Sequence, residues 1–268
     1  MPELPDVEGF RRVLERTRSS RIEAVDIHDA GVLRDVTAPR LRRALRGQAF
    51  GSPRRHGKWL IVPVRQPKRR HRDAEPSLVF HFGMTGALFW FPGEPEPLHR
   101  HDRIVVKTDR GELRLRDMRK LHGVRLAGDD SDVATILGDA GPDAADVSFD
   151  EFEQRIQGEK RQLKTAMTDQ SVVAGLGNLL VDEILWRARI HPKRPTAGLS
   201  RSDYRRIYRS MGTVLRQSIP TGRVPPRPSW LTGHRDDPVG DCPRCGTTLR
   251  RTRIGGRQTA WCPQCQPS

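Results

Sequence analysis

The sequence predicts an α+β protein of several domains: an N-terminal helix with an antiparallel β-sandwich, then a helical part, then a small cysteine-bearing β-hairpin. Three observations support this class. In the first half, several short runs alternate apolar and polar residues, as half-buried antiparallel strands do. After residue 148 the apolar spacing becomes helical, and all four cysteines lie in the last 27 residues. The 268 residues suffice for two packed domains and a smaller one.

The first half begins with a helix and continues with strands. We expect the helix over residues 5–19, where Val7, Phe10 and Leu14 fall at helical spacing behind the acidic Asp6. Runs rich in β-branched and aromatic residues then predict strands over 21–28, 58–64, 77–82, 86–91, 102–108, 112–117 and 123–126. A basic loop over 65–72 interrupts them and is expected at the surface. Together these runs favour a β-sandwich with helices at its edge.

The second half has a different pattern. Residues 129–147 are rich in Gly, Asp and Ala and predict a linker. Ser148 and Glu151 form a capping-box pattern, and helices are expected over 149–157, 160–168, 178–189 and 202–218. The proline-rich stretch 221–241 predicts a second linker. The expected division is therefore a domain over 1–128, a linker over 129–147, a domain over 148–220, and a linker with the cysteine segment over 221–268.

The charge balance bounds the class of partner. Lys and Arg number 48 against 33 Asp and Glu, a formal net charge of +15, which favours a polyanion such as nucleic acid. Anionic lipid is the alternative, but no apolar stretch approaches the roughly 18 to 20 residues of a membrane span. The N-terminus also lacks the apolar run of a signal peptide. We expect a cytosolic, monomeric protein, associated with the nucleoid if bacterial, that binds DNA and no membrane.

The four cysteines form two Cys-x-x-Cys pairs separated by sixteen residues: Cys242, Cys245, Cys262 and Cys265. This spacing lets two tight turns offer four thiolates tetrahedrally to one Zn²⁺. Because all four ligands come from the protein, the zinc is expected to be structural. Two disulfides are the alternative, disfavoured in a reducing compartment. The arginine-rich stretch between the pairs predicts a hairpin that turns at Gly255 and Gly256; its charge suits phosphate contact or offsets the anionic metal centre.

The residue Pro2 has two interpretations from the residues alone. Removal of the initiator Met would expose a secondary amine, which is nucleophilic when unprotonated and forms an iminium with a sugar C1′. An ordinary tethered chain terminus is the simpler interpretation. Similarly, Met84 can fill a core gap, Arg119 can be a surface charge, and the turn 175–178 can be a simple loop.

Five motifs together resemble the formamidopyrimidine-DNA glycosylase and endonuclease VIII family. They are MPELPDVE at the start, RRHGKWL at 54–60, HFGMTGAL at 81–88, DQSVVAGLGNLLVDEILWRARIHPKR at 169–194 and GGRQTAWCPQCQ at 255–266. The match covers nearly the whole chain in order, and the opening is similar to the formamidopyrimidine branch. The resemblance implies a β-sandwich catalytic domain, a helix-two-turn-helix DNA-binding domain and a zinc finger, with damaged double-stranded DNA as the partner and no small-molecule cofactor.

The resemblance also implies roles for individual residues. Pro2 attacks C1′ of the damaged nucleotide, and Glu3 is the acid that assists ring opening and later proton transfers. Lys58 contacts the phosphate next to the lesion. The base is excised through the iminium, and β- and δ-elimination then cut the strand. The alternatives are a non-catalytic, damage-sensing DNA-binding protein and a zinc-ribbon module of a larger assembly.

Further residues are implied to hold the DNA. Asn178 and Arg257 clamp its backbone, and the glycines Gly175 and Gly177 allow close backbone approach and an exposed helix N-terminus that favours phosphate. The residues that fill the space left by a flipped nucleotide are Met84, Arg119 and Leu121.

Three departures from the family pattern concern specificity. Leu121 stands where an aromatic wedge is usual, which weakens stacking, and Asp6 stands where Glu is usual. The stretch 218–241 is short for a loop that caps 8-oxoguanine, so activity on 8-oxoguanine is not expected. Other oxidised or ring-opened bases remain open as substrates.

Overall fold

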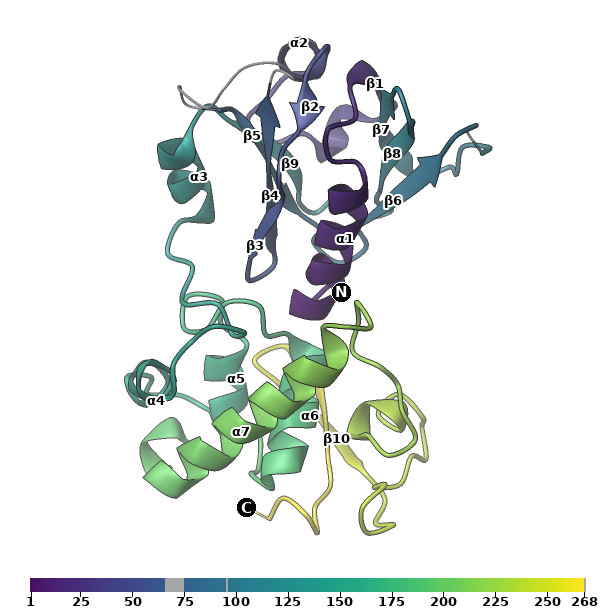
Figure 1. Ribbon diagram of the computed structural model, residues 1–268. Helices are drawn as coiled ribbons and strands as arrows, with labels where there is room; N and C mark the ends of the chain where they lie inside the picture. The colour runs from purple at the N-terminus through teal and green to yellow at the C-terminus, as the bar shows by residue number, and fades with distance from the viewer. Residues whose placement is uncertain (66–74, 95, 268) are drawn as a thin grey trace. The chain divides into compact units, whose positions relative to one another are not determined.

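The computed structural model describes residues 1–65, 75–94 and 96–267, and most of the predicted basic loop 65–72 lies outside these ranges. The described chain forms two compact units (Figure 1). The first unit comprises Met1–Pro2 and Val7–Gly138, and the second comprises Glu3–Asp6 and Asp139–Ser268. Helix α1 (Leu4–Arg16) thus begins in the second unit and continues in the first.

The first unit is built on two antiparallel sheets. One has the order β1 (Ile22–Ile27), β7 (Asp102–Thr108), β8 (Gly111–Arg116), β6 (Ala87–Pro92). The other has the order β2 (Ala49–Phe50), β4 (Trp59–Arg65), β5 (Ser77–His81), β9 (Gly123–Ala127), and β3 (Arg54–His56) pairs with β4. Side chains from both sheets, such as Leu60, Phe80, Ile104 and Leu115, share one buried core. The predicted β-sandwich is therefore confirmed.

Helices cover the sandwich. Val7 and Leu14 of α1 and the leucines Leu41 and Leu45 of α2 (Ala38–Leu45) join the shared core. On the opposite face of the second sheet, Ile61 and Val79 pack with Val133 of α3 (Asp130–Leu137). Because β4 and β5 are covered on both faces, they are almost continuously apolar instead of alternating. A short 3₁₀ helix spans Ala30–Val32.

The second unit is helical, with a terminal hairpin. Its helices are α4 (Phe149–Gln157), α5 (Leu163–Met167), α6 (Asn178–Ala188) and α7 (Arg201–Ser218), and 3₁₀ turns span Thr196–Gly198 and Leu231–Gly233. Its core includes Leu4 from the start of α1. The hairpin pairs β10 (Arg250–Ile254) with β11 (Arg257–Trp261) and turns at Gly255 and Gly256 as predicted.

Several elements differ from the sequence expectations. The expected linker 129–147 contains α3, because the Asp129 side chain accepts a hydrogen bond from Asp132 N and caps a helix there. The expected linker 221–241 is packed, with Trp230 and Arg235 buried. One of the two hydrogen bonds of the expected capping box is present, from Glu151 N to Ser148 Oγ at 3.3 Å. Helix α2 and the short strands β2 and β3 were not expected.

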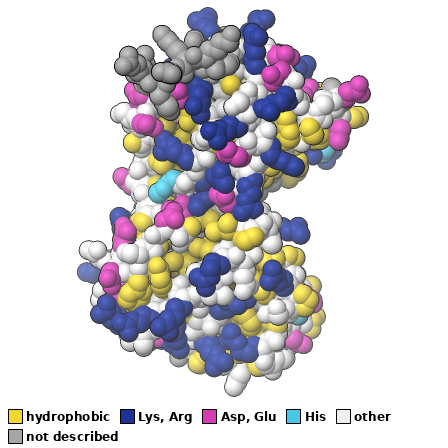
Figure 2. Space-filling model, in the orientation of Figure 1, with side chains coloured by type: hydrophobic (Ala, Val, Ile, Leu, Met, Phe, Trp, Pro, Cys, Tyr) yellow, Lys and Arg dark blue, Asp and Glu magenta, His cyan; other side chains and the backbone are white. Residues whose placement is uncertain are grey.

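The surface agrees with the basic composition. Lys and Arg side chains are spread over the displayed faces of both units (Figure 2). Among the described residues, no helix combines the length and the apolar character that a membrane crossing requires.

Candidate active site and metal centre

The carboxylate of Glu3 is held by the start of helix α6 within the second unit. Glu3 is 1% exposed, and its Oε1 and Oε2 accept hydrogen bonds from the backbone N–H groups of Leu179 at 2.8 Å and Leu180 at 3.0 Å. A carboxylate at a helix N-terminus pairs with unsatisfied donors and with the positive end of the helix dipole. Leu4 N adds a backbone bond to Gly175 O at 3.0 Å. The first residues of the chain are therefore fixed to the 175–180 turn.

Asp6 supports the same arrangement from one helical turn away. Its Oδ2 accepts a hydrogen bond from Glu3 N at 2.9 Å. Burial raises the pKa of the Asp6 carboxyl, while the bond from Glu3 N acts to lower it. The short side chain of Asp6 therefore reaches the backbone of Glu3, the candidate catalytic acid.

The glycines of the turn make room for the chain start. A Cβ at Gly177 would lie 2.2 Å from Glu3 Cδ. Gly175 has a φ of +104°, and a Cβ there would lie 2.7 Å from Leu4 Cδ1. The side chains that closely approach Gly177 and Gly175 are therefore those of Glu3 and Leu4. The expectation of an exposed helix N-terminus was wrong for two amides, those of Leu179 and Leu180, because Glu3 occupies them.

Asn178 connects this turn to the hairpin. Its Nδ2 donates to the carbonyl oxygen of Gln258 at 2.8 Å, and its Oδ1 is buried without a hydrogen-bond partner in the described chain. Arg257 precedes Gln258 at the start of β11 and is exposed. The structure thus places the two candidate clamp residues, Asn178 and Arg257, at the same end of the hairpin.

A buried cluster of charged residues that was not predicted from the sequence lies close to Asn178. Lys164 Nζ lies 2.5 Å from Asp182 Oδ1, and Arg235 Nε lies 2.9 Å from Asp182 Oδ2. Burial raises the pKa of the Asp182 carboxyl, and the two cations oppose that effect. The sequence signal for this cluster is a charged residue inside each of two apolar helical runs, Lys164 in the first and Asp182 in the second.

Lys58 lies in the first unit, in the two-residue turn between β3 and β4. His56 pairs with Trp59 across this turn, and Gly57 takes a φ of +54°, which favours glycine. Lys58 is 9% exposed. The pKa of the nearby His81 is lowered to about 3, mainly by burial of the ring and further by the charges of His122, Lys58 and Arg125. His81 is therefore neutral near pH 7, and its Nδ1 accepts from Gly83 N at 3.2 Å.

The candidate gap-filling residues lie on two loops that are tied together in the first unit. Arg119 Nη1 lies 2.8 Å from Met84 Sδ, and the side chains of Met84 and Leu121 are 41% and 49% exposed. The Asp117 carboxylate joins the loops by accepting from Thr85 Oγ1 at 2.6 Å and from Arg119 N at 3.0 Å. Met84 is therefore exposed, which argues against its alternative role as a core gap-filler.

The four cysteine sulfurs fit one tetrahedral zinc. Ligands about 2.3 Å from a tetrahedral zinc lie roughly 3.8 Å from one another. Here Cys242 Sγ lies 3.9 Å from Cys265 Sγ, Cys245 Sγ lies 3.5 Å from Cys262 Sγ, and all four lie within 4.8 Å of one another. The four cysteines form no disulfides, and Trp186 Nε1 donates to Cys242 Sγ at 3.3 Å. The donor set fits a structural Zn²⁺ with no open position for water.

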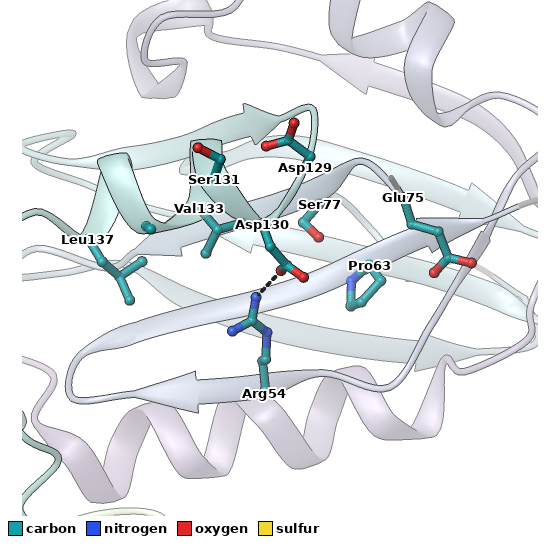
Figure 3. A pocket seen from close by; sticks show the side chains of 10 residues that line it. Arg54, Pro63, Glu75, Ser77, Asp129, Asp130, Ser131, Val133 and Leu137 are labelled. Atoms are coloured by element: carbon teal, nitrogen blue, oxygen red, sulfur yellow. Dashed lines mark hydrogen bonds and ion pairs between the residues drawn. The ribbon is translucent and has the colours of Figure 1, made fainter. Parts of the chain in front are cut away.

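A hollow of about 910 Å³ in the first unit lies away from these residues (Figure 3). Strand residues Pro63 and Ser77 line it beside the start of α3, and Arg54 pairs with Asp130 at 2.7 Å. None of the candidate site residues is among its described lining residues. The candidate active site is therefore not this hollow.

Comparisons with known proteins agree with this arrangement. Three family models match: the formamidopyrimidine-DNA glycosylase N-terminal domain at residues 1–124, the H2TH domain of the same enzyme at 139–225, and a zinc finger found in FPG and IleRS at 242–267. Formamidopyrimidine-DNA glycosylase of Rhodococcus jostii is 35% identical over 100% of this chain and 97% of its own length. The Bacillus cereus protein of the same name is 31% identical over 100% and 99%.

Solved structures match equally well. A Lactococcus lactis glycosylase non-covalently bound to DNA with an abasic site superposes with a TM-score of 0.84 at 28% identity, covering 99% of this chain and 100% of that one. A mutant of that enzyme with DNA containing Fapy-dG gives a TM-score of 0.87 at 26% identity, covering 100% of both chains. On these matches over its whole length, the chain belongs to the formamidopyrimidine-DNA glycosylase family.

Proposed function

We propose that this chain excises damaged bases from double-stranded DNA and then cleaves the strand, with Pro2 as the nucleophile and Glu3 as the proton-transfer group. The observation that carries the proposal is the pair of bonds from Leu179 N and Leu180 N to the Glu3 carboxylate. They fix a carboxylate one peptide bond from the residue whose amine would react. A carboxylate held in this place is positioned to accept a proton from that amine and to pass it on.

The proposed chemistry needs only groups of this chain and water. The unprotonated amine of Pro2, freed by removal of Met1, attacks C1′, and the bond from C1′ to the base breaks as the base takes a proton from water. The nitrogen of the adduct then loses its proton to the Glu3 carboxylate, and Glu3 passes that proton to the ring oxygen as the sugar ring opens to an iminium. Loss of a proton from C2′ expels the 3′ phosphate, and a second elimination expels the 5′ phosphate. Hydrolysis of the iminium frees the enzyme.

The remaining site residues are proposed to hold the DNA. Lys58, Asn178 and Arg257 contact phosphates around the lesion, while Met84, Arg119 and Leu121 occupy the space that the rotated nucleotide leaves. The exposure of Met84 and Leu121 and the placement of Asn178 beside the hairpin support this division. We also propose a cytoplasmic, nucleoid-associated monomer.

The test of the catalytic role is reductive trapping. Borohydride reduces an iminium to a stable crosslink, so protein whose intact mass shows loss of Met1 should form an adduct with an abasic duplex. Pro2→Gly should weaken or abolish the adduct, while Pro226→Ala, at an exposed proline, should leave it unchanged. Wild-type protein that binds the duplex and forms no adduct would instead support the damage-sensing alternative.

We propose ring-opened purines and other oxidised bases as substrates, with 8-oxoguanine a poor one. The support is the segment 221–241, which is packed onto the second unit through buried Trp230 and Arg235 and leaves little chain to cap a base. A relative has been solved with DNA containing Fapy-dG. On matched duplexes, a formamidopyrimidine should be excised at least about tenfold faster than 8-oxoguanine, equivalent to about 1.4 kcal/mol of discrimination. Equal rates would refute this preference.

A further inference from the structure

The buried cluster of Lys164, Asp182 and Arg235 converges on one backbone atom of the hairpin. The carbonyl oxygen of Gln258 accepts from Arg235 Nη2 at 2.7 Å, Asn178 Nδ2 at 2.8 Å and Lys164 Nζ at 3.2 Å. A carbonyl oxygen has two lone pairs, so three converging donors saturate it. The peptide group that follows Arg257 and Gln258 is therefore held in one orientation.

Asp182 organises these donors. One carboxylate oxygen binds Lys164, and the other binds Arg235 Nε at 2.9 Å and accepts from Ala260 N at 3.3 Å. The side chains of Lys164 and Asp182 are 0% exposed and that of Arg235 is 6% exposed. Asp182 thus contacts the hairpin directly at Ala260 and indirectly at Gln258, through both of its cations.

The cluster joins parts of the chain that are far apart in sequence. Lys164 comes from α5, Asp182 from α6, Arg235 from the segment before the zinc ligands, and Gln258 from β11. The tip of the hairpin is fixed as well, since a Cβ at Gly255 would lie 3.1 Å from Thr165 Oγ1 of α5. The hairpin is therefore held against helix α5 at its tip and against helix α6 along strand β11.

We propose that Asp182 is a positioning residue for DNA binding, which sets Arg257 and Asn178 in register so that both engage the same stretch of phosphate backbone. This rests on the proposed DNA contacts of those two residues. The Asp182 side chain is fully buried, so it acts on DNA binding through Arg257 and Asn178. Without it, Lys164 and Arg235 would lose the buried carboxylate that pairs with both of them, and the donors to Gln258 would lose their common anchor.

The test is a double-mutant cycle on affinity for an abasic duplex. Arg257→Ala should weaken binding about tenfold in the wild-type protein, as the loss of one charge-assisted phosphate contact implies. In an Asp182→Asn background the same change should weaken binding less than about threefold, because Arg257 is already misplaced. A merely structural role of Asp182 would lower the melting temperature and leave the tenfold effect intact.

Two further variants make the test decisive. Arg235→Lys keeps the positive charge but lacks the planar fork that serves both Asp182 and Gln258, so it should also shrink the Arg257→Ala effect in protein whose circular dichroism shows a native fold. Asp236→Asn makes the same charge change as Asp182→Asn at an exposed partner of Arg235 and should preserve the tenfold effect. Zinc content should stay at one per chain in all of them.

Either of two results would overturn the inference: an undiminished Arg257→Ala effect in both Asp182→Asn and Arg235→Lys, or an Arg257→Ala protein that binds as the wild type does. The catalytic proposal is judged separately by the borohydride adduct. A protein that binds abasic DNA without trapping would defeat the role of Pro2 while the affinity cycle still reports on Asp182.

Discussion

Replacing Gly177 with Ala tests whether Glu3 acts from the place where the α6 turn holds it. The new Cβ would lie 2.2 Å from Glu3 Cδ and 2.5 Å from Oε1, whereas ordinary contacts begin at 3.4 Å. The carboxylate would therefore have to move by about 1.2 Å, the difference between 3.4 and 2.2 Å. That displacement breaks the bonds to Leu179 N and Leu180 N.

The cost follows from those two bonds. Hydrogen bonds to a charged group contribute roughly 1.5 to 3 kcal/mol each, and partial rehydration of the displaced carboxylate returns some of this. We expect the free energy of unfolding to fall by about 2 to 4 kcal/mol, measured by urea denaturation. Removing a positioned proton-transfer group costs about 10²- to 10⁴-fold in rate, so single-turnover cleavage should slow by at least about 10²-fold while duplex affinity changes little.

Gly198→Ala is the matched control. An added Cβ at Gly198, in the same unit, meets nothing within 4 Å, so its stability and rate should stay near the wild-type values. If Gly177→Ala cleaved abasic DNA as fast as Gly198→Ala, the proposed role of Glu3 in its present position would be refuted.

The other predictions address the metal, the charge, the pH response and the wedge. Removing zinc with a chelator should unfold the hairpin and lower duplex affinity at least about tenfold, with recovery on adding Zn²⁺ back; an unchanged affinity would show that the metal does not support binding. If about five phosphates are contacted, log affinity against log salt should have a slope near −4 to −5, and a flat response would exclude a phosphate-binding surface. The pKa of His81 is lowered from 6.5 to about 3, so the unfolded chain binds this proton between those pH values and the folded chain does not. Stability should therefore fall as pH drops from about 6.5 toward 3, and His81→Asn should flatten that dependence in acid-denaturation curves. Leu121→Phe should strengthen stacking by about 0.5 to 1.5 kcal/mol, seen as tighter binding to abasic duplexes and a changed opposite-base preference, whereas unchanged preference would count against its wedge role.

Local patterns predicted the elements that have a strong period. Alternation located strands such as β7, β8 and β6 within a residue or two, and the cysteine spacing predicted the metal centre and the turn at Gly255 and Gly256. Helix α2 was not predicted because only Leu41 and Leu45 of its eight residues are buried, and several of the others are arginines. A linker was expected where Asp129 in fact caps α3, since the same Asp-rich composition suits both.

The arrangement of the candidate site depended on contacts that no local pattern contains. The five-motif resemblance named Glu3, but the partners of its carboxylate lie at 179 and 180. Lys164, Asp182 and Arg235 each look anomalous alone as buried charges, and only the fold shows that both cations pair with Asp182 and donate to Gln258 O. Glycine 177 likewise has no locally visible reason to be glycine; its reason is a side chain at position 3.

The attachment of residues 3 and 4 to the 175–180 turn has a practical consequence for protein production. Residue 2 is bonded to Glu3, which is held in place, so only its own backbone torsions can move its nitrogen. Any affinity tag fused ahead of residue 2 keeps that nitrogen in an amide bond, and an amide nitrogen is not the nucleophile that the proposed mechanism requires. If Pro2 is the nucleophile as proposed, recombinant protein for activity assays needs a cleavable tag that leaves no residue before position 2, and protein that keeps one extra residue should fold and bind zinc but form no crosslink.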